Sequence, residues 1–265
     1  MKIMSDITKQ VRIAAVVLCG AILAQAAAGA AAQGGTNFSK YEEPKHLTGT
    51  IYSADRKKAL FKFSRRSIRA ADKLEVFRDY AFPDGRAALK EKVIYRGDSL
   101  LEYAVDDLQS DASGSVRIVE SSGAKKAISF QYAKDARSRS APKTRTEPLR
   151  DPCLVTDMVA PFLMNHWSEL LKGSELKCRL IVVERRETVG FTFVKDSEAR
   201  RDGRNVVLVK MSPTSPIISA LVDPLFFTIE KDGRRRILEY SGRTALKVKE
   251  GNKWKDLDGV TVFEW

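Results

Sequence analysis

Acid–base and nucleophilic catalysis usually depend on a histidine held beside its partner, and this chain of 265 residues has only two histidines. His46 lies in a polar stretch, whereas His166 lies beside Trp167 within an apolar helical stripe. This position favours a histidine in the core or at the edge of a cavity. A Ser-His-Asp hydrolase stays open as an alternative, although no Gly-x-Ser-x-Gly elbow supports it. No residue is therefore predicted to be catalytic, and a non-enzymatic protein is favoured.

Other catalytic chemistries find equally little support. Glycoside hydrolysis needs two carboxylates that face each other across a sugar, but the neighbours Asp106 and Asp107 would point to opposite faces of a strand. The sequence has neither a Gly-x-x-x-x-Gly-Lys nor a Gly-x-Gly-x-x-Gly phosphate loop. Its cysteines and histidines show no metal-ligand spacing, so neither a metal nor a cofactor is predicted.

Cys153 and Cys178 are the two cysteines that follow the first 32 residues. An exported protein meets an oxidising compartment, in which such a pair can form a disulfide. In the chain-entropy model, closing a loop of about 26 residues stabilises the fold by roughly 3 to 3.5 kcal/mol. The sequence therefore predicts a disulfide between the two, with a pair of buried thiols as the alternative.

Arginines gather in four clusters beside predicted turns, and guanidinium groups bind phosphate through a bidentate fork. The clusters are Arg65, Arg66 and Arg69; Arg185 and Arg186; Arg200, Arg201 and Arg204; and Arg234, Arg235 and Arg236. Most are interpreted as solvated turn tips. Arg185 and Arg235 are proposed to meet an anionic head group at the rim of a cavity. The clusters are not interleaved with aromatic residues, so nucleic acid is not predicted as a partner.

The elements that position these residues are mostly strands joined by tight turns. Asp-Gly steps at 84–85, 202–203 and 232–233 are each flanked by apolar segments. They predict type I′ hairpin turns, because both central residues need positive φ, which Asp tolerates and Gly accepts freely. Strands are expected at 47–53, 59–64, 74–82, 87–95, 100–106, 116–121 and 127–133, and again at 176–185, 188–195, 206–211, 225–231, 235–240, 245–249 and 260–265.

Between the two runs of strands, 134–151 is expected to be a polar loop and 152–172 a helix. Apolar residues recur at helical spacing from Val155 to Leu170, and Pro161 should kink this helix or split it at Ala160. A short helix is also expected at 215–221. The predicted fold is mainly β, a large curved antiparallel sheet that forms a half-barrel or open barrel packed on one central helix.

Residues 1–32 have the layout of a cleavable secretory signal. Lys2, Lys9 and Arg12 form a basic start, and an apolar stretch and small residues follow. Cleavage is possible after 26 or after 32, and the second site is preferred, which leaves a single β-rich domain over 33–265. The apolar stretch is shorter than the roughly 20 residues of a spanning helix, so the mature protein is expected not to span the membrane.

Removing the signal lowers the net charge from +12 to 43 − 33 = +10. A basic surplus favours anionic partners such as phospholipid head groups. The expected location is the periplasm or the exterior. The aromatic C-terminal residue Trp265 is typical of outer-membrane barrels, but charges on both faces of 74–82 disfavour that class.

Several segments resemble families of uncharacterised exported bacterial envelope proteins. The similar segments are Asp157-Met158, Trp167 to Gly173, Leu-Val-Asp-Pro at 221–224 and Tyr-Ser-Gly-Arg at 240–243. These families have no assigned activity, so no catalytic residue is carried over. The layout is similar to lipoprotein-carrier half-barrels, in which an unclosed barrel wraps helices and shelters an acyl chain. By this analogy, Phe162, His166 and Trp167 are expected to line a cavity.

Together these observations predict an exported envelope protein that binds a lipid or another amphiphile in the cavity of its curved sheet. Two alternatives stay open. The first is a structural or assembly protein whose surface docks an envelope partner. The second, which is less favoured, is an unrecognised hydrolase that uses His166.

Overall fold

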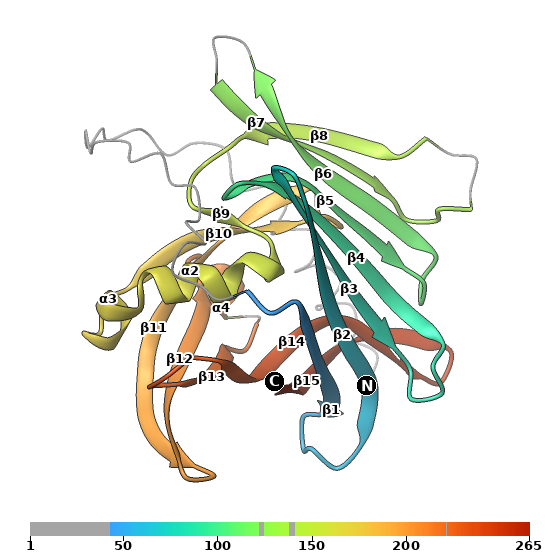
Figure 1. Cartoon of the computed structure of the whole chain (residues 1–265). Helices are drawn as coiled ribbons and strands as arrows, with labels where there is room; N and C mark the ends of the chain where they lie inside the picture. The colour runs from blue at the N-terminus through green and yellow to red at the C-terminus, as the bar shows by residue number, and fades with distance from the viewer. Residues whose placement is uncertain (1–42, 122–124, 138–140, 221) are drawn as a thin grey trace. The chain divides into compact units, whose positions relative to one another are not determined.

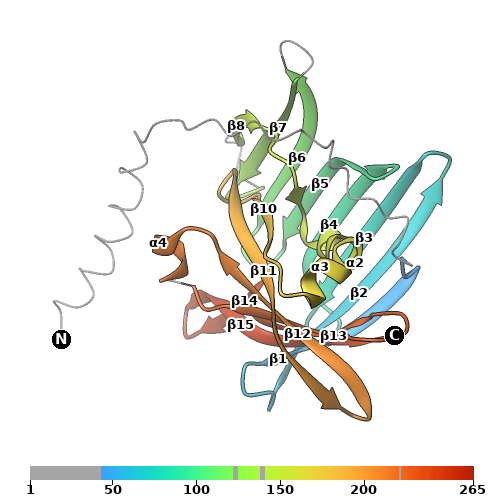
Figure 2. The same ribbon diagram turned by 90° about the vertical axis from the view of Figure 1, so that its left-hand side faces the viewer.

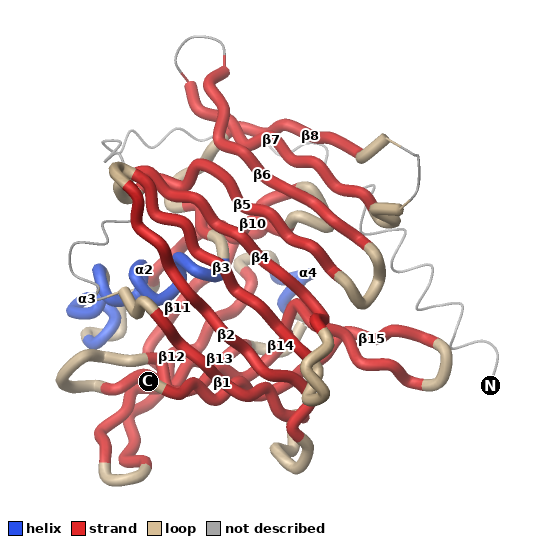
Figure 3. The backbone as a smooth tube through the Cα atoms, turned by 45° about the vertical axis from the view of Figure 1, so that its right-hand side comes forward, coloured by secondary structure: helices blue, strands red, loops and turns tan. Residues whose placement is uncertain are grey.

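The computed structural model describes residues 43–121, 125–137, 141–220 and 222–265. The predicted signal and both of its cleavage sites lie outside these residues. The described residues form one large, open, curved sheet of fifteen strands with few helices (Figures 1 and 3). Among the strand pairs of these described residues, only that of β9 with β10 is parallel. The predicted fold class, a mainly β protein built on a large curved sheet, is confirmed.

Two meanders make up this sheet. The first contains β1 (His46–Ser53), β2 (Ala59–Ala70), β3 (Lys73–Ala81), β4 (Ala87–Arg96), β5 (Ser99–Asp107), β6 (Ala112–Ser121), β7 (Lys125–Ala133) and β8 (Lys143–Pro148). The second contains β9 (Cys153–Leu154), β10 (Leu176–Val182), β11 (Glu187–Arg201), β12 (Arg204–Pro213), β13 (Leu225–Glu230), β14 (Ile237–Glu250) and β15 (Lys253–Glu264). The meanders join where β1 pairs with β15, which leaves β8 and β9 at the two edges.

Several predicted strands are shorter than the observed ones, as at β2, β11 and β15, and two further predictions are wrong. The stretch expected to be a polar loop contains the edge strand β8, in which five of the six residues are exposed. A strand with water on both faces has no apolar alternation, so its sequence gives no period-two signal. The strands expected at 235–240 and 245–249 are one strand, β14, whose pairing with β15 shifts between Arg243 and Lys247.

The Asp-Gly steps behave differently from one another. Asp202 and Gly203 have φ of 48° and 77°, which confirms the predicted type I′ geometry between β11 and β12. Between β3 and β4 only Gly85 has positive φ, at 88°. In the turn between β13 and β14, the residues with positive φ are Gly233 and Arg235, and not the predicted pair Asp232 and Gly233. This turn is therefore longer than the predicted type I′ turn.

The helix predicted over 152–172 is shorter and is broken. It consists of a 3-10 turn η2 (Thr156–Met158), α2 (Val159–Asn165) and α3 (Trp167–Leu171). The break is at His166, which has φ −103° and ψ 18°, and not at Ala160. Pro161 does not split the helix because it lies in the first turn of α2, where no helical hydrogen bond needs its missing donor. The predicted short helix is present as α4 (Pro216–Ser219).

The helices α2 and α3 lie inside the curve of the sheet, between β10–β13 on one side and β2–β4 on the other (Figures 1 and 2). Their buried residues belong to one apolar core with strands of both meanders. The ring centroid of Phe193 in β11 lies 5.9 Å from Phe162 in α2 and 6.0 Å from Phe227 in β13. A second apolar cluster joins β1, β2, β4, β14 and β15. None of the described helices has the length and hydropathy to cross a membrane.

Candidate functional site

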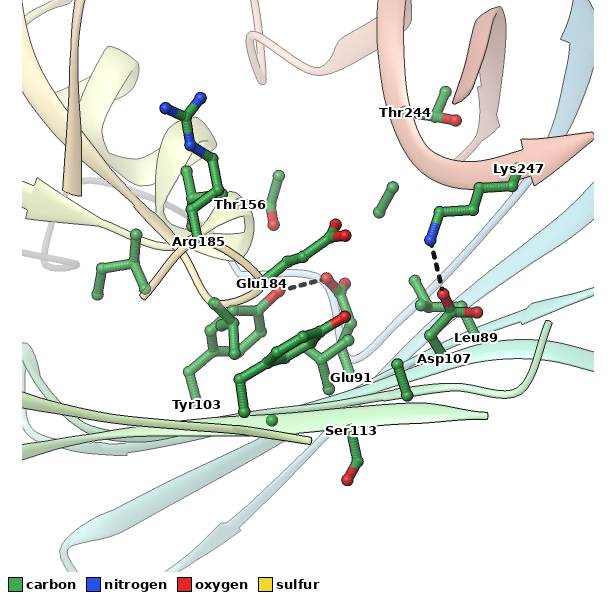
Figure 4. A pocket seen from close by; sticks show the side chains of 18 of the residues that line it. Leu89, Glu91, Tyr103, Asp107, Ser113, Thr156, Glu184, Arg185, Thr244 and Lys247 are labelled. Carbon is green, nitrogen blue, oxygen red and sulfur yellow. Dashed lines mark hydrogen bonds and ion pairs between the residues drawn. The ribbon is translucent and has the colours of Figure 1, made fainter. Parts of the chain in front are cut away.

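Two adjoining chambers lie on the concave side of the sheet. The apolar chamber has a volume of about 330 Å³, and its apolar walls include Phe63, Leu180, Phe191, Met211, Leu225 and Phe227. The polar chamber has a volume of about 430 Å³, and its charged walls are Glu91, Asp107, Glu184, Arg185, Arg243, Lys247 and Asp256 (Figure 4). Both volumes fall within the roughly 300–1,000 Å³ of typical small-molecule sites.

The two chambers share one wall. Glu91, Thr156, Arg243, Thr244 and Ala245 line both of them. An apolar space therefore lies next to a charged one, under a single sheet. Two residues that line the apolar chamber, Trp265 and Arg243, are also 41% and 39% exposed.

A row of charged side chains crosses the inner face of three neighbouring strands. Arg65 on β2 is in register with Arg78 on β3, which is in register with Glu91 on β4. Side chains alternate along a strand, so residues that face each other in register share a face of the sheet. The sequence pattern of β2 agrees, because the buried residues Phe61 and Phe63 precede Arg65 at steps of two.

Glu91 is the centre of one buried network. Its carboxylate lies 2.9 Å from Arg78 Nη1 and accepts hydrogen bonds from Tyr103 at 2.5 Å and Tyr80 at 3.2 Å. Burial raises the pKa of Tyr103, and the negative charge of Glu91 raises it further. The network therefore consists of a neutralised ion pair with two neutral phenols.

Asp157 is the centre of a second network, which ties the start of the helical segment to the sheet. It accepts hydrogen bonds from Arg65 Nε at 2.7 Å, from Arg65 Nη2 at 3.1 Å and from Tyr95 at 3.0 Å. Burial by itself raises the pKa of Asp157, but the charge and hydrogen bonds of Arg65 outweigh burial and hold the pKa below its ordinary value of 3.8. The ionised carboxylate is therefore the form that the fold stabilises.

With this geometry established, the chain was compared with known proteins. No protein-family model, curated protein or solved structure matches it. The resemblance drawn from sequence segments thus stays an expectation, and function is inferred from the chambers. Within the described ranges, no group of three or more His, Cys, Asp or Glu side chains is placed to hold a metal ion.

The helix residues expected to line a cavity line neither chamber. Phe162 and Trp167 are 3% exposed and belong to the apolar core. The side chain of His166 is 40% exposed, and its Nδ1 lies 3.2 Å from Glu169 Oε2. Among the described residues, no Ser or Thr hydroxyl is hydrogen-bonded to His166, as a hydrolytic triad would require. The helical segment contributes its N-terminal end to the apolar chamber instead, through Val159 and Ala160.

The two arginines expected at the rim are not brought together. Arg185 lines the polar chamber, but its Nε lies 2.7 Å from Glu187 Oε1. Arg235 lines neither chamber, and its guanidinium lies 5.8 Å from the centre of the Trp167 ring. Sequence reasoning missed Arg78, and it placed Arg65, which is only 7% exposed, among the solvated turn tips. For Arg65 a signal exists. The signal that identifies it is its period-two spacing from buried aromatic residues.

Cys153 and Cys178 are separate buried thiols in the structure, so the alternative to the predicted disulfide is the one observed. Cys153 is in register with Arg179 across the β9–β10 pair. Because successive side chains of a strand point to opposite faces, Cys178 points away from the face that Cys153 occupies. This register explains why proximity in the sheet does not produce a bond.

Both thiols should resist alkylation in the folded protein. Burial raises the pKa of each to about 12, so almost no thiolate, which is the reactive form, is present at pH 8. Treatment with iodoacetamide at pH 8 followed by intact-mass analysis should find both unmodified in native protein and both modified in urea. Rapid labelling of native protein would contradict the burial. A failure to label in urea until a reductant is added would show a disulfide.

Proposed function

We propose that this chain is an exported cell-envelope protein that binds a lipid or another amphiphile inside its curved sheet. The observation that carries the proposal is the shared wall of the two chambers. An apolar space beside a charged one, with lining residues in common, fits the two-part chemistry of an amphiphile. The export part of the proposal depends on the signal-like residues 1–32.

The apolar chamber provides the binding energy in this proposal. Its walls come from both meanders, with Phe63 and Ile51 on one side and Phe191, Met211 and Phe227 on the other. Each methylene group transferred from water into such surroundings stabilises the complex by about 0.8 kcal/mol. A chain that fills the chamber therefore gains affinity with its length until the walls are reached.

Filling the apolar chamber with a side chain should weaken ligand binding. Ala160 lies on α2 at the wall of this chamber, and Ala160→Trp places an indole where we expect the ligand chain to lie. Displacing two or three methylene groups should lower the affinity for a fluorescent fatty acid by more than about tenfold. Fluorescence titration measures this affinity, with circular dichroism to verify the fold.

The matched control is Ala199→Trp, which adds the same side chain at an exposed position of β11, away from both chambers. This variant should bind as the parent protein does. If folded Ala160→Trp and the parent protein bind the probe with equal affinity, the apolar chamber is not the binding site. The proposal as a whole fails if protein purified from its native host carries no lipid by mass spectrometry and binds no fatty-acid probe.

A further inference from the structure

We infer that the polar chamber holds the head of the amphiphile and selects a positively charged ammonium head over an anionic one. This inference rests on the proposed function and names the ligand class of the same site. The charge of this head group is opposite to the one expected from the sequence, in which the arginine clusters favour an anionic head. The reason lies in which charges around the chamber are already paired.

Each basic side chain of the polar chamber already has a carboxylate partner. Lys247 Nζ lies 3.2 Å from Asp107 Oδ2, and Arg185 Nε lies 2.7 Å from Glu187 Oε1. Arg243 pairs with both Asp256, at 2.9 Å, and Asp258, at 2.7 Å. An anionic head entering this chamber would have to compete with these carboxylates for each cation.

One carboxylate of the chamber has no such partner. Glu91 is satisfied by Arg78, Tyr80 and Tyr103, as described above. By contrast, Glu184 makes no hydrogen bond or ion pair with any residue that the structure describes. It stands in the turn between β10 and β11, and its side chain extends toward the middle of the chamber in Figure 4.

The charge of Glu184 acts across the chamber. Burial lowers the pKa of Lys247, and Asp107 and Glu184 together more than offset this and raise it. Burial raises the pKa of Tyr132, and the negative charge of Glu184 raises it further. The chamber lining therefore holds four carboxylates and three cations, and the unpaired charge is negative. A primary ammonium group carries three donors and would satisfy this carboxylate with charge-assisted hydrogen bonds.

Three probes with the same chain separate the head group from the tail: dodecylamine, dodecanoic acid and dodecanol. Each is titrated below its aggregation limit at pH 7 and about 0.15 M salt, where the general surface potential is screened. Displacement of a bound fluorescent fatty acid measures each affinity. Dodecylamine should bind about tenfold more tightly than dodecanol, and dodecanoic acid should bind no more tightly than the alcohol.

Glu184→Gln removes the unpaired charge and keeps the size of the side chain. It should reduce the advantage of dodecylamine over dodecanol to less than about threefold and leave the affinity for dodecanol unchanged. The control is Glu169→Gln, which makes the same change of net charge at an exposed position of α3 away from both chambers. The control should keep the full preference for the amine.

The outcomes distinguish this inference from the proposed function. The preference for an ammonium head is contradicted if dodecanoic acid binds as tightly as dodecylamine, or if Glu184→Gln and Glu169→Gln change the preference for the amine equally. In either case the protein still binds amphiphiles. If none of the three probes displaces the fluorescent ligand or binds directly, the proposed function itself fails.

Discussion

Asp157→Ala should destabilise the folded protein by about 3–5 kcal/mol, the cost of removing one partner of a buried ion pair. The variant leaves the Arg65 guanidinium, which is 7% exposed, without the carboxylate that accepts two of its hydrogen bonds, and Glu43 Oε1, 2.9 Å from Nη2, remains as its ionic partner. It also leaves the Tyr95 hydroxyl without this acceptor. Because Asp157 lies in η2, directly before α2, the loss should loosen the attachment of the helices to β2 and β4. Urea unfolding followed by fluorescence measures the change.

The matched control is Asp72→Ala, which removes the partner of an exposed arginine. Asp72 Oδ2 lies 2.8 Å from Arg96 Nε, with side chains 63% and 57% exposed, so this change should cost less than about 1 kcal/mol. The double variant Arg65→Met with Asp157→Ala removes both charges and should recover part of the loss. Equal effects of Asp157→Ala and Asp72→Ala would show that the Arg65–Asp157 pair contributes no more to stability than an exposed pair does.

The same carboxylate sets a dependence on pH. Its folded-state pKa lies below the ordinary value of 3.8, so its contribution to the free energy of unfolding is complete above that value. The contribution is then lost as pH falls through the folded pKa. The stability difference between the parent and Asp157→Asn should therefore be constant near neutral pH and shrink below pH 3.8. A difference that stays constant into acid would contradict the depressed pKa.

Local patterns were sufficient to predict most of the fold. The alternation of apolar and polar residues located thirteen of the strands, because one face of each is buried against the core. One end of β2, β11 and β15 was missed by six or seven residues. Two of the failures have opposite causes. In β8 neither face is buried, so no pattern exists. In the helical segment, the apolar stripe continues through His166, although the backbone there leaves the helix.

The candidate site was less predictable than the fold. Arg65, Arg78 and Glu91 are separated by turns, and their meeting depends on the register of three strands. Composition shows an excess of arginine, but it does not show which arginine is buried. Phe61 and Phe63 show which side chains of β2 point toward the core, and the same alternation identifies Arg65 as a buried arginine. The unpaired state of Glu184 depends on the side chains around the polar chamber, which come from seven strands, so local sequence cannot predict it.

Phe193→Ala should destabilise the protein by about 3–5 kcal/mol, because it removes a fully buried aromatic ring from the contact between the helices and the sheet. The ring of Phe193 lies between Phe162 of α2 and Phe227 of β13, so the cavity would open where the sheet curves around the helix. Chemical denaturation with an unchanged denaturant dependence would assign the loss to packing. A change below about 1 kcal/mol would mean that the apolar stripe of α2 is not covered by the second meander.

Two further variants make this test specific. Phe193→Leu keeps most of the apolar volume and should cost less than Phe193→Ala, by about 2 kcal/mol or more. Trp254→Ala removes a larger aromatic side chain that is 40% exposed on β15, and it should change stability by less than about 1 kcal/mol. If the losses of stability follow this order, Phe193 acts through its packing between the helices and the sheet. A general loss of apolar surface would instead make Trp254→Ala the most costly change. The apolar chamber requires that contact, because Val159 and Ala160 of α2 line it only while the sheet holds the helix in place.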